Sequence, residues 1–266
     1  MFTYKDYVLN TVESICPFKK KSIYSHSYYY DMFVHVLKNV NSWRSLSLLA
    51  NLKGKPKYHY TSIRKMFNVW SKHDIFNIAY KNMLLDLNLN MPNSPVYSGN
   101  DIDLFIDATF INNKNGSELV SINPLYYKKN VTKISIISDV DKIPLSIVPV
   151  KTTSYDGKTI DQTIKHIQFN RRVNLIGDKG YVINKVHKKL LYKNKIKLIV
   201  PKKKNQKNIR LSKYDKSKLK IRYKVENSIQ FLKRFNRIST RKDRLIRNFI
   251  SFMYLASGIS FTNKIN

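Results

Sequence analysis

Residues 102–111 read IDLFIDATFI and predict a β-strand whose apolar run contains one central carboxylate, Asp107. A second apolar stretch, VNLIGD at residues 173–178, predicts another strand, which ends at Asp178 and runs into the turn KGY. A third acid, Glu226, lies far along the chain in RYKVENSIQFLKRF, which has helical spacing. An ionised carboxylate within an apolar strand is costly unless it is paired or binds a cation. The three acids therefore suggest a shared cation.

The order of elements around these acids predicts a mixed α/β sheet covered by helices. Residues 1–96 show helical stripes and no strand alternation, and a linker with two prolines and one glycine follows at 89–100. We therefore predict a small all-helical domain over residues 1–96 and an α/β domain over residues 97–266. Besides the Asp107 strand, we expect strands at residues 131–140, 143–150, 173–178 and 196–200, and helices at 159–169 and 183–192.

The charge balance indicates the class of partner. The chain of 266 residues has 49 Lys and Arg against 17 Asp and Glu, a formal net charge of +32. Such a protein is attracted to polyanions and releases their counterions on binding, so nucleic acid is the expected partner. An A·T-rich source genome is an alternative source of lysine, but it does not by itself account for so few acids.

Other classes are excluded or disfavoured. The single cysteine, Cys16, excludes an intramolecular disulfide framework and a Cys-based zinc site. We expect no signal peptide, and the longest apolar helix, at residues 249–261, is too short to span a bilayer. The protein is therefore predicted to be soluble and intracellular, in the cytoplasm of a bacterium or in the nucleus of a eukaryotic or virus-infected cell.

Two basic segments are candidate DNA contacts. Helices at residues 28–40 and 61–70, joined through the turn-like GKP at 54–56, suit a helix-turn-helix unit, with a plain helical bundle as the alternative. The basic run at residues 201–220 suggests a mobile loop or an arm that contacts the DNA backbone, although a solvated charge run has the same composition. The candidate contacts in these segments are Arg44, Arg64, Lys65, Lys202, Lys203 and Lys204.

The three acids have a chemical interpretation and a structural one. Cleavage of a phosphodiester needs an activated nucleophile and a stabilised leaving oxygen, which two Mg²⁺ ions about 3.5 to 4 Å apart supply. Carboxylates are the ligands that Mg²⁺ prefers, and Mn²⁺ is the expected substitute. Alternatively, Asp107 is hydrogen-bonded at a strand edge, Asp178 only shapes its turn, and Glu226 only pairs with Arg222 one helical turn earlier.

At these residues the sequence resembles the DDE transposases of short bacterial insertion sequences, whose catalytic domain has a ribonuclease-H-like fold. IDAT at residues 106–109 resembles the first-acid strand of the family, and GDKGY at 177–181 is similar to its second-acid motif. In the third motif, Arg222, Glu226 and Lys233 fall at the family's intervals, while Leu219 occupies the position of its tyrosine. This departure leaves the acid intact and puts the role of the tyrosine in doubt.

The likeness extends over most of the chain. Residues 237–248 and the apolar helix after them resemble the family's C-terminal end, and residues 129–139 resemble its second strand. Asp156 stands where many members carry a His-Asp pair, with Tyr155 in place of the histidine.

The resemblance implies a DNA transposase of a mobile element. Asp107, Asp178 and Glu226 would be the catalytic acids and Mg²⁺ ligands for cleavage at the element ends and for transfer of the freed 3′ hydroxyl into double-stranded target DNA. Arg222, Lys233 and Lys179 would contact the DNA, and pairing two ends suggests a homodimer. A catalytically silent DNA-binding relative and a junction resolvase with the same fold are the alternatives.

Overall fold

The computed structural model describes residues 2–16, 24–39, 42–46, 59–86, 102–123, 129–165, 167, 172–202 and 211–265. The chain packs as two compact units. One unit contains Met1–Met83, Asn112–Glu118 and Leu232–Asn266, and the other contains Leu84–Ile111 and Leu119–Phe231. The sequence predicts one domain before and one after the boundary between residues 96 and 97. In the structure, the C-terminal residues pack in the same unit as the N-terminal helices.

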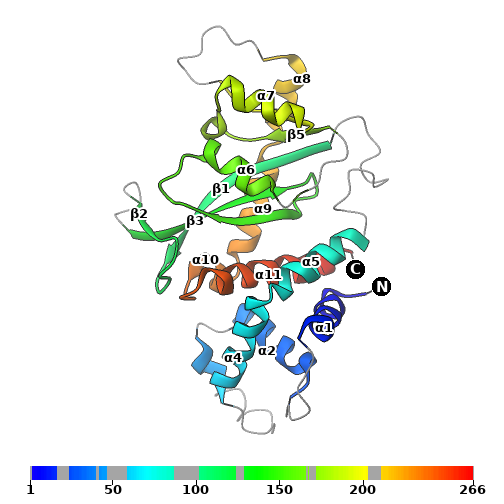
Figure 1. The fold of residues 1–266 in the computed structure, drawn as a ribbon, viewed down its shortest axis with the longest axis vertical. Coiled ribbons are helices and arrows are strands. Elements are labelled where there is room, and N and C mark those ends of the chain that lie inside the picture. Colours follow the sequence, from blue (N-terminus) through cyan, green and yellow to red (C-terminus); the bar gives the residue numbers. More distant parts are fainter. Residues whose placement is uncertain are drawn as a thin grey trace. The chain divides into compact units, whose positions relative to one another are not determined.

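The second unit is built on a mixed sheet with the order β2-β3-β1-β5-β6, and β4 pairs with β3 (Figure 1). β5 is parallel to β1 and β6 is parallel to β5, while β2 and β4 are antiparallel to β3. The strands are β1 (Ile102–Asn113), β2 (Ser121–Asn123), β3 (Lys129–Ser138), β4 (Pro144–Val150), β5 (Val173–Ile176) and β6 (Ile196–Ile199). The predicted mixed α/β sheet is thereby confirmed.

The hairpin between β3 and β4 forms where the sequence predicts it. The Asp139 carboxylate accepts hydrogen bonds from the backbone N–H groups of Asp141 and Ile143, at 2.9 and 2.8 Å. Lys142 has a positive φ of 67°, which closes the tight turn.

Short helices pack on this sheet. α6 (Ile160–Ile164) contacts β3 and β4, and it follows the 3₁₀-helix η3 (Asp156–Thr159), so the helix predicted at 159–169 begins earlier and is α-helical over five residues. α7 (Lys185–Lys193) packs on β6. A second 3₁₀-helix, η4 (Lys179–Tyr181), follows β5 and contacts η3.

The basic run at residues 201–220 is not irregular throughout. α8 (Lys213–Lys220) begins after Ser212, whose hydroxyl accepts a hydrogen bond from the backbone N–H of Asp215. Ion pairs hold this helix to the sheet, Lys218 Nζ to Asp103 Oδ2 at 2.6 Å and Asp215 to Lys197 at 2.8 Å. The prediction of a loop is therefore wrong for these eight residues. Residues 203–210 lie outside the described part of the chain.

The first unit has an aromatic core. Phe67 stacks on Phe252 with ring centroids 4.2 Å apart, and Phe33 lies edge-on to Phe67 at 5.0 Å. The Arg237 guanidinium lies over the rings of Trp43 and Phe252 and pairs with buried Asp243 at 2.7 Å. The helices are α1 (Tyr4–Ile15), α2 (His26–Asn39), η1 (Trp43–Ser45), α4 (Tyr60–Lys72), α5 (Ile75–Asp86), α10 (Asn236–Ser239) and α11 (Ile246–Ile265).

The helix-turn-helix prediction depends on residues that are only partly described. Helices α2 and α4 are present where helical stripes predict them, and they pack against each other. The connecting GKP turn at 54–56 and the linker at 89–100 lie outside the described residues. A two-residue strand, β7 (Thr240–Arg241), pairs with Asn112 and Asn113 at the end of β1. In the ranges that the structure describes, no helix is long and apolar enough to cross a membrane.

Gly258 in α11 generates a stability prediction. A Cβ at this position would collide with the ring of buried Tyr4, whose hydroxyl donates to the Phe76 carbonyl at 2.8 Å. Glycine in an open helix interior is about 1 kcal/mol less favourable than alanine, so Gly258→Ala would stabilise a helix without this contact. Here we expect a loss of about 1 to 3 kcal/mol through overpacking, measured by urea unfolding. Ser257→Ala, which adds no atom, is the control; a gain in stability for Gly258→Ala would contradict the packing.

Candidate active site

The parallel pairing of β1 with β5 brings two of the predicted acids level with each other. Ile102 pairs with Val173, and Asp107 and Asp178 each lie five residues further along their strands. Because parallel strands in register advance together, both acids lie two residues beyond the last pair of β1 with β5, where β5 has ended and β1 continues. Asp107 is half-buried within β1, and Asp178 directly precedes η4.

The pKa of Asp107 is raised from 3.8 to about 6. Burial is the largest cause, because it disfavours the charged form, and the negative charges of Asp178 and Glu226 act in the same direction. The hydrogen bond from the Ala108 N–H, at 2.8 Å, and the positive charge of Arg222 oppose the shift. The structure therefore couples Asp107 electrostatically to both of the other predicted acids.

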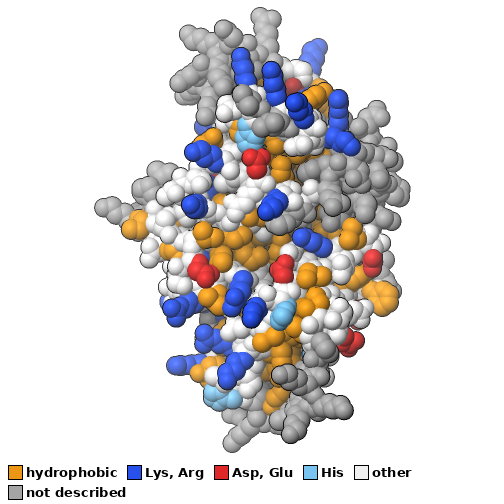
Figure 2. Space-filling view, in the orientation of Figure 1, with side chains coloured by type: hydrophobic (Ala, Val, Ile, Leu, Met, Phe, Trp, Pro, Cys, Tyr) orange, Lys and Arg blue, Asp and Glu red, His pale blue; other side chains and the backbone are white. Residues whose placement is uncertain are grey.

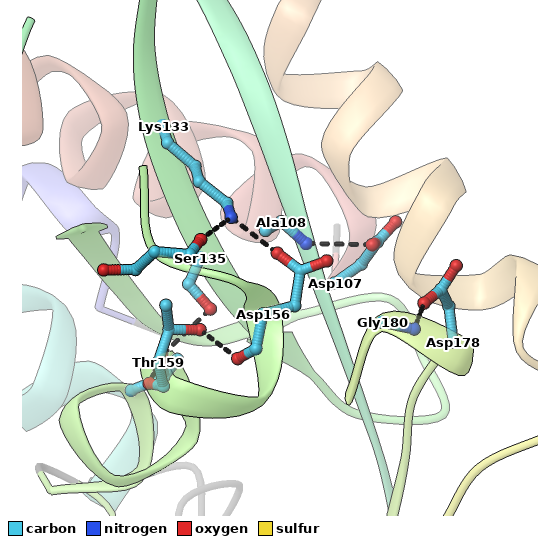
Figure 3. A network of polar contacts seen from close by, with 10 residues as sticks. Asp107, Ala108, Lys133, Ser135, Asp156, Thr159, Asp178 and Gly180 are labelled. Atoms are coloured by element: carbon cyan, nitrogen blue, oxygen red, sulfur yellow. Dashed lines mark hydrogen bonds and ion pairs between the residues drawn. The ribbon is translucent and has the colours of Figure 1, made fainter. Parts of the chain in front are cut away.

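Asp178 is oriented by its own turn. Its carboxylate accepts a hydrogen bond from the backbone N–H of Gly180 (Figure 3). Its carbonyl accepts a hydrogen bond from the backbone N–H of Tyr181 at 3.1 Å. Tyr181 is buried, and its ring packs so closely on Gly177 that a Cβ there would lie 3.0 Å from it. The predicted turn-shaping role is thus observed, and it leaves the carboxylate at the sheet edge.

Glu226 lies in the first turn of α9 (Tyr223–Lys233). Its carboxylate pairs with the Arg222 guanidinium at 2.7 Å, four residues earlier, and both side chains are partly exposed. The interaction that the sequence offers as an alternative role is therefore present. It occupies one oxygen of Glu226 and brings a positive charge to the acids.

The three carboxylates are the oxygen ligands that a hard divalent cation prefers, and their mutual repulsion is relieved by such a cation. Their side chains do not converge fully, however. Among the described residues, no three His, Cys, Asp or Glu side chains are grouped closely enough to hold one metal ion. The donor set fits Mg²⁺ by chemistry and by charge, while the metal-ligand and catalytic roles stay predictions.

The sequence analysis did not identify Lys133 as part of this site, and it noted Asp156 without assigning it a role. Lys133 of β3 pairs with Asp156 of η3 at 2.7 Å, and Asp156 lies beside the Gly180 turn (Figure 3). A signal for Lys133 was present, since it is a lysine within the apolar run VTKISIIS of a predicted strand. Its partner lies 23 residues away and could not be read from that run.

The candidate DNA contacts are spread over the chain. Arg44, Arg64, Lys65 and Lys179 are exposed, whereas Arg222, Lys233 and Lys202 are partly exposed. Of these, the structure brings Arg222 to the acids, and Lys179 directly follows Asp178. Figure 2 shows Lys and Arg side chains distributed over the visible face. Lys203 and Lys204 lie outside the described residues, and none of these residues is tested as a DNA contact.

A mixed α/β sheet with acids level on neighbouring parallel strands is the architecture expected of the DDE class. Residues 99–259 match the family described as Transposase DDE domain. This span covers more than half of the chain and contains Asp107, Asp178 and Glu226. The chain therefore belongs to this transposase family, as the resemblance in its motifs implies.

A solved structure supports the same fold. The chain is similar to the piggyBac transposase in a cryo-EM structure of its synaptic complex with hairpin DNA, with a TM-score of 0.53 and 12% sequence identity. The likeness covers 97% of this chain and 71% of that chain. At this identity it concerns the fold alone. Among curated proteins, no sequence matches the chain.

The raised pKa of Asp107 predicts that this acid destabilises the metal-free protein. The folded state binds the Asp107 proton more tightly than the unfolded chain, so its contribution to stability is full below pH 4 and is lost as pH rises through 6. A shift of this size corresponds to at most about 3 kcal/mol. In EDTA at pH 7.5, we expect Asp107→Asn to be more stable than wild type by about 2 kcal/mol, with no difference at pH 4. Urea unfolding at both pH values measures this, and equal stabilities at pH 7.5 would contradict the shift.

Proposed function

We propose that this protein is a DNA transposase that cuts at the ends of a mobile element and joins the freed 3′ hydroxyl to double-stranded target DNA. The observation that carries the proposal is the level placement of Asp107 within β1 and Asp178 just after the neighbouring parallel strand β5, with Glu226 acting electrostatically on Asp107, inside the family span. A half-buried carboxylate whose pKa is raised by burial and by neighbouring acids is typical of functional sites.

Asp107, Asp178 and Glu226 would hold Mg²⁺, with Mn²⁺ as a substitute, and the bound ions would stabilise charge on the attacking and leaving oxygens of the phosphodiester. Asp107 and Asp178 form the fixed part, because one lies within a strand and the other is oriented by its turn. Glu226 would turn from Arg222 towards the other two acids.

Arg222 is the residue best placed to contact the phosphate at the cut. Its guanidinium is partly exposed, lies 2.7 Å from Glu226 and acts electrostatically on Asp107. A guanidinium can exchange a carboxylate for a phosphate with little change in geometry. The formal net charge of +32 supports duplex DNA as the partner, and bringing two element ends together supports a homodimer in the DNA complex.

A second candidate function is a catalytically silent DNA-binding protein. The observation that favours it is that the three carboxylates do not converge on one metal position in the described structure, with Glu226 paired to Arg222. Such a protein would bind the element ends with the same basic surface and would not cut them.

Asp107→Asn distinguishes the two candidates. The carboxylate is removed without a change of shape, so we expect cleavage and strand transfer to fall to the level without protein, while DNA binding stays within about twofold. The assay uses DNA with the element's own flanking ends and compares Mg²⁺ or Mn²⁺ with EDTA.

Asp161→Asn is the matched control, because Asp161 is exposed and pairs with His187 at 2.8 Å, outside the three acids. Cleavage that persists in Asp107→Asn would exclude the catalytic assignment. Binding without cleavage by the wild-type protein would favour the silent DNA-binding protein.

A further inference from the structure

Lys133 is a buried cation in the middle of the apolar strand β3. It is 4% exposed, and its neighbours Thr132 and Ile134 are fully buried. Lysine is rarely buried to this degree unless it is paired, because desolvation of the ammonium group is costly. Lys133 is also too enclosed to contact DNA in this conformation, so its role must be exerted on other residues of the protein.

Two contacts fasten Lys133 to the segment that leads into η3. Its ammonium group donates to the Ser154 carbonyl at 2.7 Å and pairs with Asp156 Oδ1 at 2.7 Å. The same group lies 5.7 Å from the centre of the Phe110 ring on β1. The position of η3 is therefore tied to the sheet at two points through one side chain.

The second oxygen of Asp156 lies at the turn that presents Asp178 (Figure 3). A Cβ added to Gly180 would lie 2.5 Å from Asp156 Oδ2 and 2.9 Å from Asp178 Oδ1. The carboxylates of Asp156 and Asp178 thus approach the same glycine Cα, and a larger residue there would displace one of them. A second close approach, between Gly157 and the Val182 carbonyl, also joins η3 to the residues after η4.

The pKa of the buried Tyr181 phenol is raised by Asp156 as well as by two acids of the site. Burial raises the pKa of Tyr181 well above its ordinary range, and the charges of Asp156, Asp107 and Asp178 raise it further. The three carboxylates therefore lie within electrostatic range of one phenol. Asp156 and Asp178 would repel each other across Gly180 if the Lys133 ammonium did not neutralise Asp156.

We propose that Lys133 and Asp156 form a positioning pair for Asp178: Lys133 holds Asp156 against Gly180, and this contact fixes the turn from which the Asp178 carboxylate enters the site. Asp178 depends on this support because its carboxylate is oriented through the Gly180 N–H. The consequence for cleavage rests on the proposed function, whereas the effect on the turn does not.

The test separates positioning from simple packing by removing both charges together. Lys133→Met or Asp156→Asn alone leaves a charge without its partner, so both stability and cleavage should fall. In the double variant Lys133→Met/Asp156→Asn no charge is left unpaired, and we expect the melting temperature to recover. Without the pair, we expect the amides of Gly180 and Tyr181 to exchange with solvent at least tenfold faster, as measured by NMR in EDTA without DNA.

The same double variant should cut end-bearing DNA at least tenfold more slowly in single turnovers at saturating DNA, with DNA affinity within twofold of wild type. The matched control is Lys197→Met/Asp215→Asn, which removes a 2.8 Å ion pair between β6 and α8 and should leave both readouts unchanged.

Unchanged exchange at Gly180 and Tyr181 in the Lys133 and Asp156 double variant would overturn the proposal. Restored cleavage together with restored stability would also overturn it, because the pair would then serve packing alone. If the wild-type protein does not cut DNA, the proposed function fails, and amide exchange by itself still decides whether the pair positions the turn.

Discussion

The parallel register between β1 and β5 is the constraint on which the site depends. Ile102 pairs with Val173, so Asp107 and Asp178 lie at the same distance along their two segments, just past the end of β5. A shift of one residue would turn one of the two side chains to the opposite face. The apolar residues of both strands, such as Phe105 and Ile176, are buried and hold this register, so the core also sets the geometry of the acids.

The acids of this region differ in their electrostatic surroundings. Burial and two neighbouring acids raise the pKa of Asp107, and the backbone hydrogen bond from Ala108 only partly offsets this shift. Asp156, by contrast, is paired with the ammonium group of Lys133 on β3 at 2.7 Å. Among the described residues, one acid thus has no ion pair with a lysine of the sheet, while the other has one.

Several of these features could be predicted from the sequence, and the exceptions have physical reasons. An acid within an apolar run is visible locally, so Asp107 and its strand were predictable. α8 was not, because its residues form no apolar stripe and ion pairs such as Lys218 with Asp103 hold it across 115 residues. Packing of the C-terminal α11 on α4 and α1 is equally non-local, and no linker signals it. The Lys133 and Asp156 pair likewise depends on tertiary structure.

The energies of two ion pairs indicate which part of the site can move. Arg222 and Glu226 form a partly exposed pair four residues apart on a helix, a kind worth about 0.3 to 0.5 kcal/mol, so a phosphate or a cation can separate them easily. In the Lys133 and Asp156 pair the lysine is almost completely enclosed and the acid is partly exposed, so breaking it costs more than breaking the helix pair and less than the roughly 3 to 5 kcal/mol of a fully buried pair. Asp107, which lies within β1, and Asp178, which its own turn orients, are therefore held more firmly than Glu226. Among the described residues the three acids do not converge on one metal position, and the contact of Glu226 with Arg222 is weak enough to be exchanged when a cation binds, as the proposed function requires.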